Sequence, residues 1–179
     1  MDNLQTRFKK EIAGKLKGEL GIKNVHQIPN LIKIVINMGV KDAVADKKNM
    51  EAAILEFTQV VGQKPKVTKA KQSIAAFKLR EGDKIGLVAT LRGKRMYDFF
   101  EKLTNVIFPR LRDFHGIKKD NFDGRGNFTL GFSEIAVFPE IDPGKVEKAQ
   151  GLEITIVTNA KDDTKGLALL TALGMPFVK

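Results

Sequence analysis

Two short stretches, residues 31–38 and 85–92, constrain the fold most strongly, because apolar side chains occupy every second position in them. Side chains of a β-strand point alternately to its two faces, so this spacing predicts two strands, each with one buried face. The predicted buried residues are Ile32, Ile34, Ile36 and Met38 in the first strand and Ile85, Leu87, Ala89 and Leu91 in the second. The residues predicted to face outward are Lys33, Val35 and Asn37 in the first and Gly86, Val88, Thr90 and Arg92 in the second.

The two outward faces share a chemistry. Each has small or β-branched residues, one neutral hydrogen-bonding side chain and one cation. A solvent face usually carries long charged side chains, whereas a low face with amide and hydroxyl groups lets another backbone approach closely. The wide minor groove of RNA offers 2′-hydroxyls to such groups. An ordinary solvent face, or one covered by a helix, is the alternative interpretation, and the strands alone leave both open.

Residues 62–95, which contain the second strand, carry ten cations against two acids, Glu81 and Asp83. The cations are Lys64, Lys66, Lys69, Lys71, Lys78, Arg80, Lys84, Arg92, Lys94 and Arg95. Burying an unpaired ammonium group is unfavourable, so these side chains are predicted to form a surface that suits a phosphate-bearing partner. Residues 69–76 follow neither the helical nor the strand period and predict an exposed loop or irregular hairpin tip, and residues 81–83 predict a turn.

The chain of 179 residues has 31 Lys and Arg against 21 Asp and Glu, and the resulting formal charge of +10 favours nucleic acid or an acidic membrane as a partner. It has no cysteine, which excludes disulfides, thiolate zinc sites and cysteine nucleophiles. The charged N-terminal stretch lacks the apolar segment of a secretory signal, and no apolar run is long enough to span a bilayer. A soluble cytoplasmic protein is expected.

The remaining residues predict helices and further strands. Helical spacing extends over residues 3–18, 46–61, 94–108 and from about 163 to 173, with Asp46 and either Asp162 or Asp163 as N-caps and Gly62, Pro109 and Gly174 as stops. Strands are predicted at 151–158, at the end of 122–132 and, briefly, within 133–142. Because helices do not regularly separate the strands, we expect an α+β fold in a single domain of residues 1–179. Its mainly antiparallel sheet would have helices packed on one face and the other face open for RNA.

No catalytic residue, metal site or cofactor is predicted. His26 and His115 are far apart in loop-like contexts, and neither has a companion at metal-ligand spacing. Ser73 and Ser133 lack the glycine setting of a nucleophile elbow. Phe99 and Phe100 could stack on bases, but their helical spacing favours core packing.

Three other functions fit the basic character of the chain less well. A duplex-DNA module would present a basic recognition helix, whereas the most basic region here is predicted to be strand and loop. An enzyme acting on a phosphorylated substrate could use 62–95 as its anion site, but it would need a general base or a metal cluster. A peripheral membrane protein would need a long amphipathic helix with bulky interfacial aromatics, which is missing.

Six strings of the sequence, in order and spread over most of its length, resemble the family of bacterial large-subunit ribosomal protein L five. They are INMGV (36–40), GQKPKVTKAKQSIAAFKLREGDKIG (62–86), TLRGKRMYDFFEKL (90–103), FPRLRDFHGI (108–117), FDGRGNF (122–128) and FPEID (138–142). The resemblance implies an α+β fold and a non-enzymatic, structural role in the central protuberance of the large ribosomal subunit. Its implied partners are 5S rRNA, 23S rRNA, the P-site tRNA, neighbouring proteins of the protuberance and a protein of the small-subunit head.

The resemblance also assigns residues to these partners. The positions that match the 5S rRNA-binding motifs are Asn37, Met38, Gly39, Gln63, Lys64, Thr90 and Arg92, and Thr68 is a plausible addition. The positions expected to contact the tRNA elbow are Lys71, Gln72, Ser73, Lys78 and Arg80. Residues 110–117 and 139–145 resemble the part of the family that reaches the small-subunit head. Many relatives carry a basic residue where this chain has neutral Gln72, and an arginine where it has His115, so both positions lower the local charge.

Overall fold

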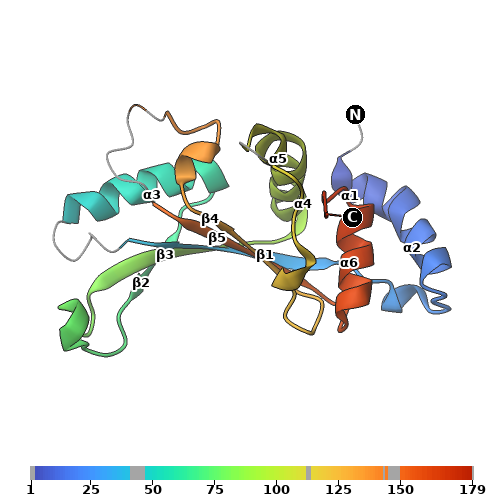
Figure 1. Cartoon of the computed structure of the whole chain (residues 1–179), viewed down its shortest axis with the longest axis horizontal. Coiled ribbons are helices and arrows are strands. Elements are labelled where there is room, and N and C mark those ends of the chain that lie inside the picture. Colours follow the sequence, from blue (N-terminus) through green and yellow to red (C-terminus); the bar gives the residue numbers. More distant parts are fainter. Residues whose placement is uncertain (1–2, 41–46, 112–113, 143, 145–149, 179) are drawn as a thin grey trace. The chain divides into compact units, whose positions relative to one another are not determined.

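The computed structural model describes residues 3–40, 47–111, 114–142, 144 and 150–178. Its strands form a five-stranded antiparallel sheet in the order β2-β3-β1-β5-β4 (Figure 1). These are β1 (Leu31–Gly39), β2 (Lys66–Lys69), β3 (Lys84–Leu91), β4 (Phe128–Phe132) and β5 (Leu152–Thr158). The prediction of an α+β fold with an antiparallel sheet is confirmed.

The chain divides into two compact units. The first comprises Met1–Ile34, Leu91–Leu130 and Thr155–Lys179, and the second comprises Val35–Thr90 and Gly131–Ile154. The boundaries fall inside β1, β3, β4 and β5, so these four strands contribute residues to both units. The single domain expected over residues 1–179 stays a prediction.

In the second unit, helix α3 (Lys47–Val61) lies along one face of the strands, and no described α-helix of that unit lies on the opposite face (Figure 1). Its buried side chains recur at helical spacing and are Met50, Ala53, Phe57, Val60 and Val61. The helix ends as predicted at Gly62, whose left-handed φ of 70° lets its N–H donate to the carbonyl of Thr58. The expected N-cap, Asp46, lies outside the described residues.

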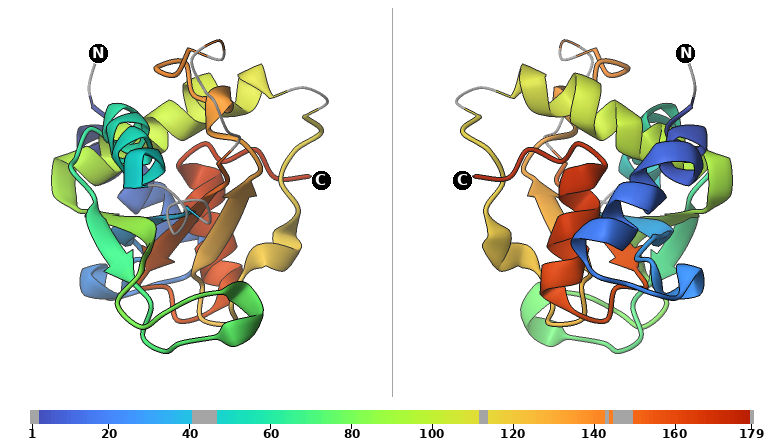
Figure 2. Two further views of the ribbon diagram at one scale, coloured as in Figure 1. Left: turned by 90° about the vertical axis from the view of Figure 1, so that its left-hand side faces the viewer. Right: turned by 90° about the vertical axis from the view of Figure 1, so that its right-hand side faces the viewer.

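Strands β2 and β3 of the same unit form an antiparallel hairpin in which Val67 lies opposite Leu87. The one-turn helix η4 (Ala75–Phe77) closes its tip (Figure 2). At the base of the tip, Ala70 donates to the carbonyl of Asp83, and Gly82 donates to that of Ala70. The irregular tip over residues 69–76 and the turn at 81–83 are therefore confirmed.

The first unit holds the other described α-helices. At its N-terminus, α1 (Leu4–Arg7), a π-helical turn over Phe8–Ile12 and α2 (Ala13–Glu19) run on as one helical segment, which confirms the helix expected over 3–18. The unit also contains α6 (Asp163–Ala172) and two one-turn 3₁₀ helices, η2 (Val25–Gln27) and η6 (Lys119–Asn121). Asp162 caps α6, because its carboxylate accepts a hydrogen bond from the N–H of Thr164 at 3.2 Å.

A third helical segment of this unit comprises α4 (Gly93–Lys102), a π-helical turn over Leu103–Ile107 and α5 (Phe108–Arg110). The prediction that Pro109 ends this segment is wrong, since the helix includes Pro109 and extends to Arg110. Proline is tolerated there because the first turn of a helix does not need its missing N–H.

Aromatic side chains form much of the core of the first unit. Phe100 is fully buried, and Phe99 is 4 % exposed, so neither ring is available to stack on a base. A second cluster joins Phe122, Phe128 and Phe177, with ring centroids 4.7 to 6.1 Å apart. Among the described residues, no helix is long and apolar enough to cross a membrane.

Two further local predictions are wrong. Residues 133–142 contain a 3₁₀ turn, η7 (Ile135–Val137), and no strand among those described. Ile135 and Phe138 are both fully buried, and a spacing of three suits such a turn better than a strand. Ile32, expected to be buried, is 44 % exposed although Ile34 and Ile36 of the same strand are fully buried.

Candidate nucleic-acid interface

The face of the second unit opposite α3 carries the low side chains predicted from the strand alternation. We call it the open face, and it includes Val35 and Asn37 of β1 and Val88 and Thr90 of β3. Thr90 is exposed and the other three are half-buried. The alternate residues on the α3 side are buried, namely Ile36, Met38, Leu87 and Ala89. The alternation expected for both strands is therefore confirmed over residues 35–38 and 87–90, whereas Ile85, expected to be buried, is half-buried.

Gly86 is the lowest point of the open face. It pairs with Thr68 across the hairpin. A Cβ atom built on it would lie 2.7 Å from the carbonyl oxygen of Met38 and 3.0 Å from Oγ1 of Thr68. Gly86 is buried, although the sequence pattern predicted an outward residue, because its two neighbouring strands close over it. No local sequence pattern signals this close approach, since the pairing of β2 with β3 is not a local property.

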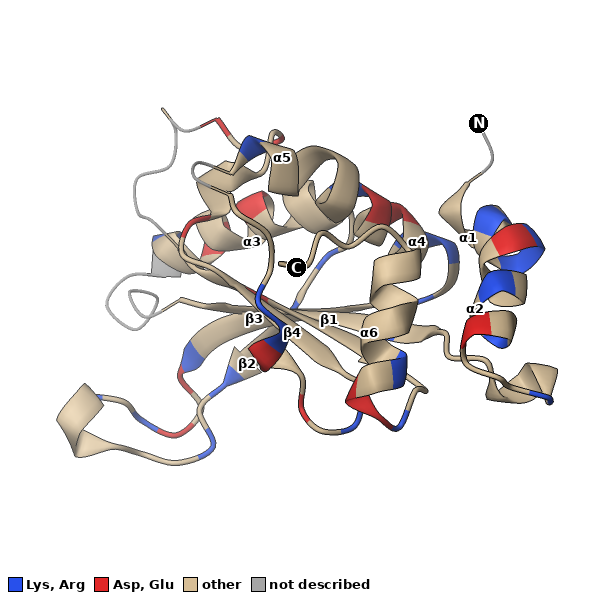
Figure 3. Cartoon of the chain, turned by 45° about the vertical axis from the view of Figure 1, so that its right-hand side comes forward, with Lys and Arg blue, Asp and Glu red and all other residues tan. Residues whose placement is uncertain are grey.

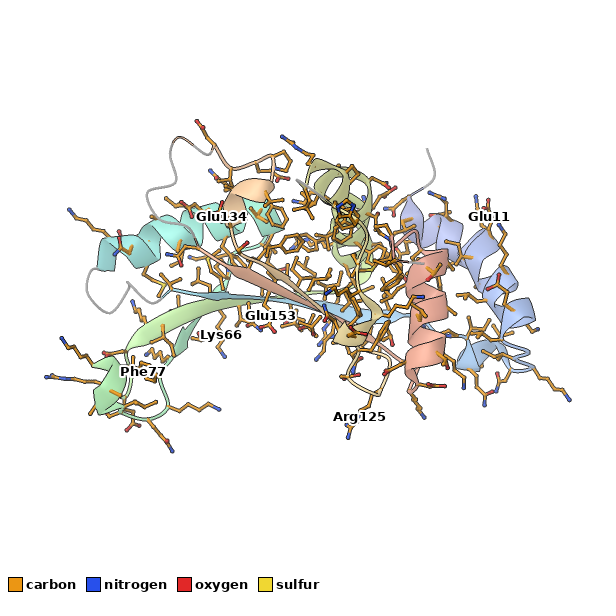
Figure 4. All side chains as sticks on the ribbon, in the orientation of Figure 1. Glu11, Lys66, Phe77, Arg125, Glu134 and Glu153 are labelled. Atoms are coloured by element: carbon orange, nitrogen blue, oxygen red, sulfur yellow. The ribbon has the colours of Figure 1, made fainter. Side chains whose placement is uncertain are left out.

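Lysines flank this low surface along β2. Lys66 is exposed and pairs with Val88, which places it on the open face (Figure 4). Lys64 is also exposed and comes two residues earlier, just before β2 begins. Basic residues follow both strands of the hairpin toward its tip (Figure 3). Glu153 of β5, which alternates with buried Leu152 and Ile154, adds an acid to the same face (Figure 4).

The residues expected to bind 5S rRNA are not equally available. Asn37, Thr68 and Thr90 present side chains on the open face, and Lys64 stands beside it. The remaining four are Met38, Gly39, Gln63 and Arg92. The side chain of Met38 is 2 % exposed, so this residue can offer RNA little more than its backbone.

The last three differ in setting. Gly39 is exposed at the end of β1, and a Cβ on it would meet no atom within 4 Å. Gln63 is half-buried and lies in the segment of the chain that connects α3 to β2. Arg92 is exposed at the N-cap position of α4 and belongs to the first unit. The structure thus gathers five of the eight residues around β1, β2 and β3 as side chains or open backbone.

The residues expected to contact tRNA all lie at the hairpin tip and are all exposed. They are Lys71, Gln72, Ser73, Lys78 and Arg80. The tip is held by its own hydrogen bonds, since Ile74 and Leu79 donate to each other's carbonyl groups at 2.9 and 3.1 Å. The N–H of Glu81 donates to Oγ of Ser73 at 2.9 Å. Lys78 adopts a left-handed φ of 51°, a backbone conformation that residues other than glycine rarely adopt.

The apolar residues of 62–95, Ile74 and Phe77 among them, are expected from the sequence to form a packed underside to the cationic surface, and for these two the expectation is wrong. Phe77 at the hairpin tip is 76 % exposed (Figure 4), and Ile74 is 43 % exposed. The available signal was a phenylalanine inside a basic stretch with no helical or strand period. Such a residue has no regular element through which it could be buried.

The histidines and the segments expected to reach the small-subunit head form no further site among the described residues. His26 and His115 are both exposed. Among the described residues, no group of three or more His, Asp or Glu side chains could hold a metal ion. Of the segments expected to reach the small-subunit head, residues 112, 113, 143 and 145 lie outside the described residues, while Arg110 and Glu140 are exposed.

Comparison with known proteins decides the family. The model for ribosomal protein L5 matches residues 24–80, and the model for the C-terminus of the same ribosomal family matches residues 84–177. The chain belongs to the ribosomal protein L5 family. It is 56 % identical over 176 residues to the large ribosomal subunit protein uL5 of Mesoplasma florum, covering 98 % of each chain. It is also 56 % identical to the protein of that name from Desulfatibacillum aliphaticivorans, over the full length of both.

Membership of the L5 family confirms the resemblance seen in the six sequence strings. It also confirms that the chain is not an enzyme, because this is a family of structural ribosomal proteins. The two family models meet between residues 80 and 84, at the turn that leads from the hairpin tip into β3.

Proposed function

We propose that the chain is a structural constituent of the large ribosomal subunit and that it attaches 5S rRNA to the central protuberance through the open face. Membership of the L5 family supports the first part and places the protein in the ribosome, in the cytoplasm. The further partners proposed are 23S rRNA, the P-site tRNA and neighbouring proteins, including one of the small-subunit head.

The observation that carries the 5S proposal is the low surface around Gly86. No side chain rises from this position, the hydroxyl of Thr68 lies beside it, and the amide of Asn37 belongs to the same face on the neighbouring strand β1. An RNA backbone can therefore approach close enough for its 2′-hydroxyls to meet these groups. Lys64 and Lys66 at the margin are placed to neutralise phosphates without blocking that approach.

This arrangement predicts that the neutral side chains and the lysines contribute differently to RNA binding, and substitutions can separate the two contributions. Thr90→Ala or Asn37→Ala should weaken 5S binding by about 1 kcal/mol while leaving the salt dependence nearly unchanged, since a neutral hydrogen bond is lost. Lys64→Ala should instead lower the slope of log affinity against log salt by about 0.7–0.9, because one phosphate contact is lost. Filter binding to 5S rRNA across a salt series measures both quantities.

Lys23→Ala is the control for Lys64→Ala, since it removes an exposed lysine of the first unit and should change neither quantity. Transfer RNA and duplex DNA of equal charge serve as competitors for the wild type. If both competitors abolish 5S rRNA binding equally, the proposed recognition is contradicted. It is also contradicted if Thr90→Ala and Lys64→Ala change the slope of log affinity against log salt by the same amount.

For the hairpin tip we propose contact with the P-site tRNA elbow. Removing its cations in a Lys71→Ala, Lys78→Ala, Arg80→Ala variant should leave 5S affinity within about twofold of wild type, because the tip is separate from the open face in the hairpin. Ribosomes that carry the variant should lose P-site tRNA faster than wild-type ribosomes, which a filter-retention time course measures. An unchanged tRNA dissociation rate combined with weakened 5S binding would assign the tip to 5S rRNA instead.

A further inference from the structure

The loop between Phe122 and β4 in the first unit is built almost entirely by two carboxylates. Asp163 accepts hydrogen bonds from the N–H groups of Gly124 and Gly126, at 3.1 and 2.8 Å. Asp123 accepts from the N–H groups of Arg125 and Asn127, at 2.9 and 3.1 Å. Four consecutive backbone donors are therefore directed inward, and the loop has a defined shape without any bound partner.

The side chain of Asn127 completes this loop. Its Nδ2 donates to Asp123 at 2.7 Å, and its Oδ1 accepts from the N–H of Thr158 at 3.0 Å. The hydrogen bond from Nδ2 is the main reason why the pKa of Asp123 lies below its ordinary value. The carboxylate is consequently ionised at neutral pH and committed to the loop.

The side chain of Arg125 takes no part in these hydrogen bonds. It is exposed and points away from the body of the unit (Figure 4). Across from it stands Lys161, which is also exposed. Between them lies an open hollow of about 420 Å³, lined by Arg125, Asn127, Val157, Thr158 and Lys161. Within the described part of the chain, neither cation forms an ion pair with an acid.

The floor of the hollow is rigid. The hydroxyl of Thr158, a residue only 6 % exposed, donates to the carbonyl of Gly126 at 2.7 Å and accepts from the N–H of Ala160 at 3.2 Å. Its one hydroxyl hydrogen is thus used within the protein and is not available to a ligand. One Nδ2 hydrogen of Asn127 remains for a ligand, since the amide has two and gives one to Asp123.

Lys161 occupies a backbone position that disfavours it. Its φ is 61°, in the left-handed region where glycine is accommodated more easily than a lysine. The lysine therefore brings a conformational penalty, and what it adds to the protein is a positive charge at the rim of the hollow. The nearby acid Asp162 does not cancel this charge from within the hollow, because its carboxylate caps α6 through Thr164.

We propose that this hollow, called here the Arg125–Lys161 seat, binds a backbone phosphate of ribosomal RNA at a place separate from the open face. Two cations and one amide hydrogen over a closed, partly apolar floor suit a phosphodiester, whose oxygens only accept hydrogen bonds and whose ribose can lie against Val157. The inference rests on the proposed function in one respect, that the chain binds ribosomal RNA.

Lys161→Gly tests the seat without endangering the fold. Glycine relieves the left-handed backbone, so the thermal midpoint should stay the same or rise, while RNA binding loses one phosphate contact. The fall in affinity between 50 and 200 mM salt should become about threefold smaller than for the wild type. Filter binding to purified 5S rRNA and to purified 23S rRNA, measured separately, gives the result for each RNA.

Matched variants complete the experiment. Arg125→Ala should act like Lys161→Gly, Arg125→Lys should retain most of the wild-type salt dependence, and Lys118→Ala, an exposed cation outside the seat, should change nothing. An unchanged salt dependence of Lys161→Gly and Arg125→Ala on both RNAs would overturn the proposal. The proposal would also be overturned if inorganic pyrophosphate shifted the amide NMR signals of Gly124 and Gly126 while Lys161→Gly and Arg125→Ala left the binding of both RNAs unchanged. That result would indicate a site for small anions.

Failure of the seat and failure of the open face are distinguishable. Thr90→Ala reports on the open face alone, because Thr90 lies in the second unit and takes no part in the hollow. Weakened 5S binding by Thr90→Ala with wild-type behaviour of Lys161→Gly would leave the proposed function intact and reject only the seat.

Discussion

Gly86→Ala should destabilise the protein by about 1–3 kcal/mol and weaken 5S rRNA binding at the same time. The added methyl group would lie 2.7 Å from the carbonyl oxygen of Met38, a backbone atom that cannot turn aside as a flexible side chain can. Relief requires β1 and β3 to move apart, which strains the ladder between them. The same methyl group raises the lowest point of the open face and keeps an RNA backbone at a greater distance.

Urea unfolding and 5S filter binding measure the two effects of Gly86→Ala. Gly131→Ala is the matched control, because Gly131 also lies in a strand, has no left-handed φ, and a Cβ on it would meet nothing within 4 Å. The control should be unchanged or up to about 1 kcal/mol more stable. If Gly86→Ala unfolds at the same urea concentration as Gly131→Ala, the close approach of the strands at Gly86 is not a constraint on the fold.

Gly126→Ala should reduce the free energy of unfolding even more than Gly86→Ala, by about 2–5 kcal/mol. Two causes act together. The φ of 80° is left-handed, and the new Cβ would lie 2.8 Å from both the Cβ of Ala160 and the carbonyl oxygen of Asp162. The loop would have to leave α6, and the hydrogen bond from Thr158 to the carbonyl of Gly126 would be lost with it.

Gly124→Ala separates these two causes. Its φ of 81° is nearly the same, but a Cβ there would meet no atom within 4 Å. This variant should lose only the left-handed backbone term, about 1–2 kcal/mol. The difference between the two variants in urea unfolding isolates the steric part, and equal losses would show that the contact between Gly126 and residues 160–162 is relieved at little cost.

The regular elements could be predicted from the sequence because their signals are local. The alternation in 85–92 and the spacing of Met50, Ala53 and Phe57 each require only one strand or one helix to be read correctly. The errors also have local causes. Pro109 is compatible with the first turn of a short helix, and the three-residue spacing of Ile135 and Phe138 belongs to a 3₁₀ turn where a short strand was expected.

The functional surface was less predictable because it depends on which strands pair. The outward positions of Asn37 and Thr90 followed from alternation alone. The role of Gly86 required the register that places Thr68 opposite it and Met38 beside it, and no short-range pattern contains that register. The hollow beside Arg125 likewise depends on Asp163, a residue 38 positions further along the chain, for which the sequence pattern predicts only a helix cap.

The hydrogen bonds within the hairpin tip fix the exposure of Phe77 in the free protein. Because Ile74 and Leu79 close the tip with their own hydrogen bonds, Phe77 remains in water in a chain that has not met its partner, and it cannot retreat into the core. The ring of Phe77 and the half-exposed side chain of Ile74 can therefore be covered only by a second molecule that reaches the tip. Any partner of the tip consequently meets an apolar contact as well as the charges of its lysines and arginine.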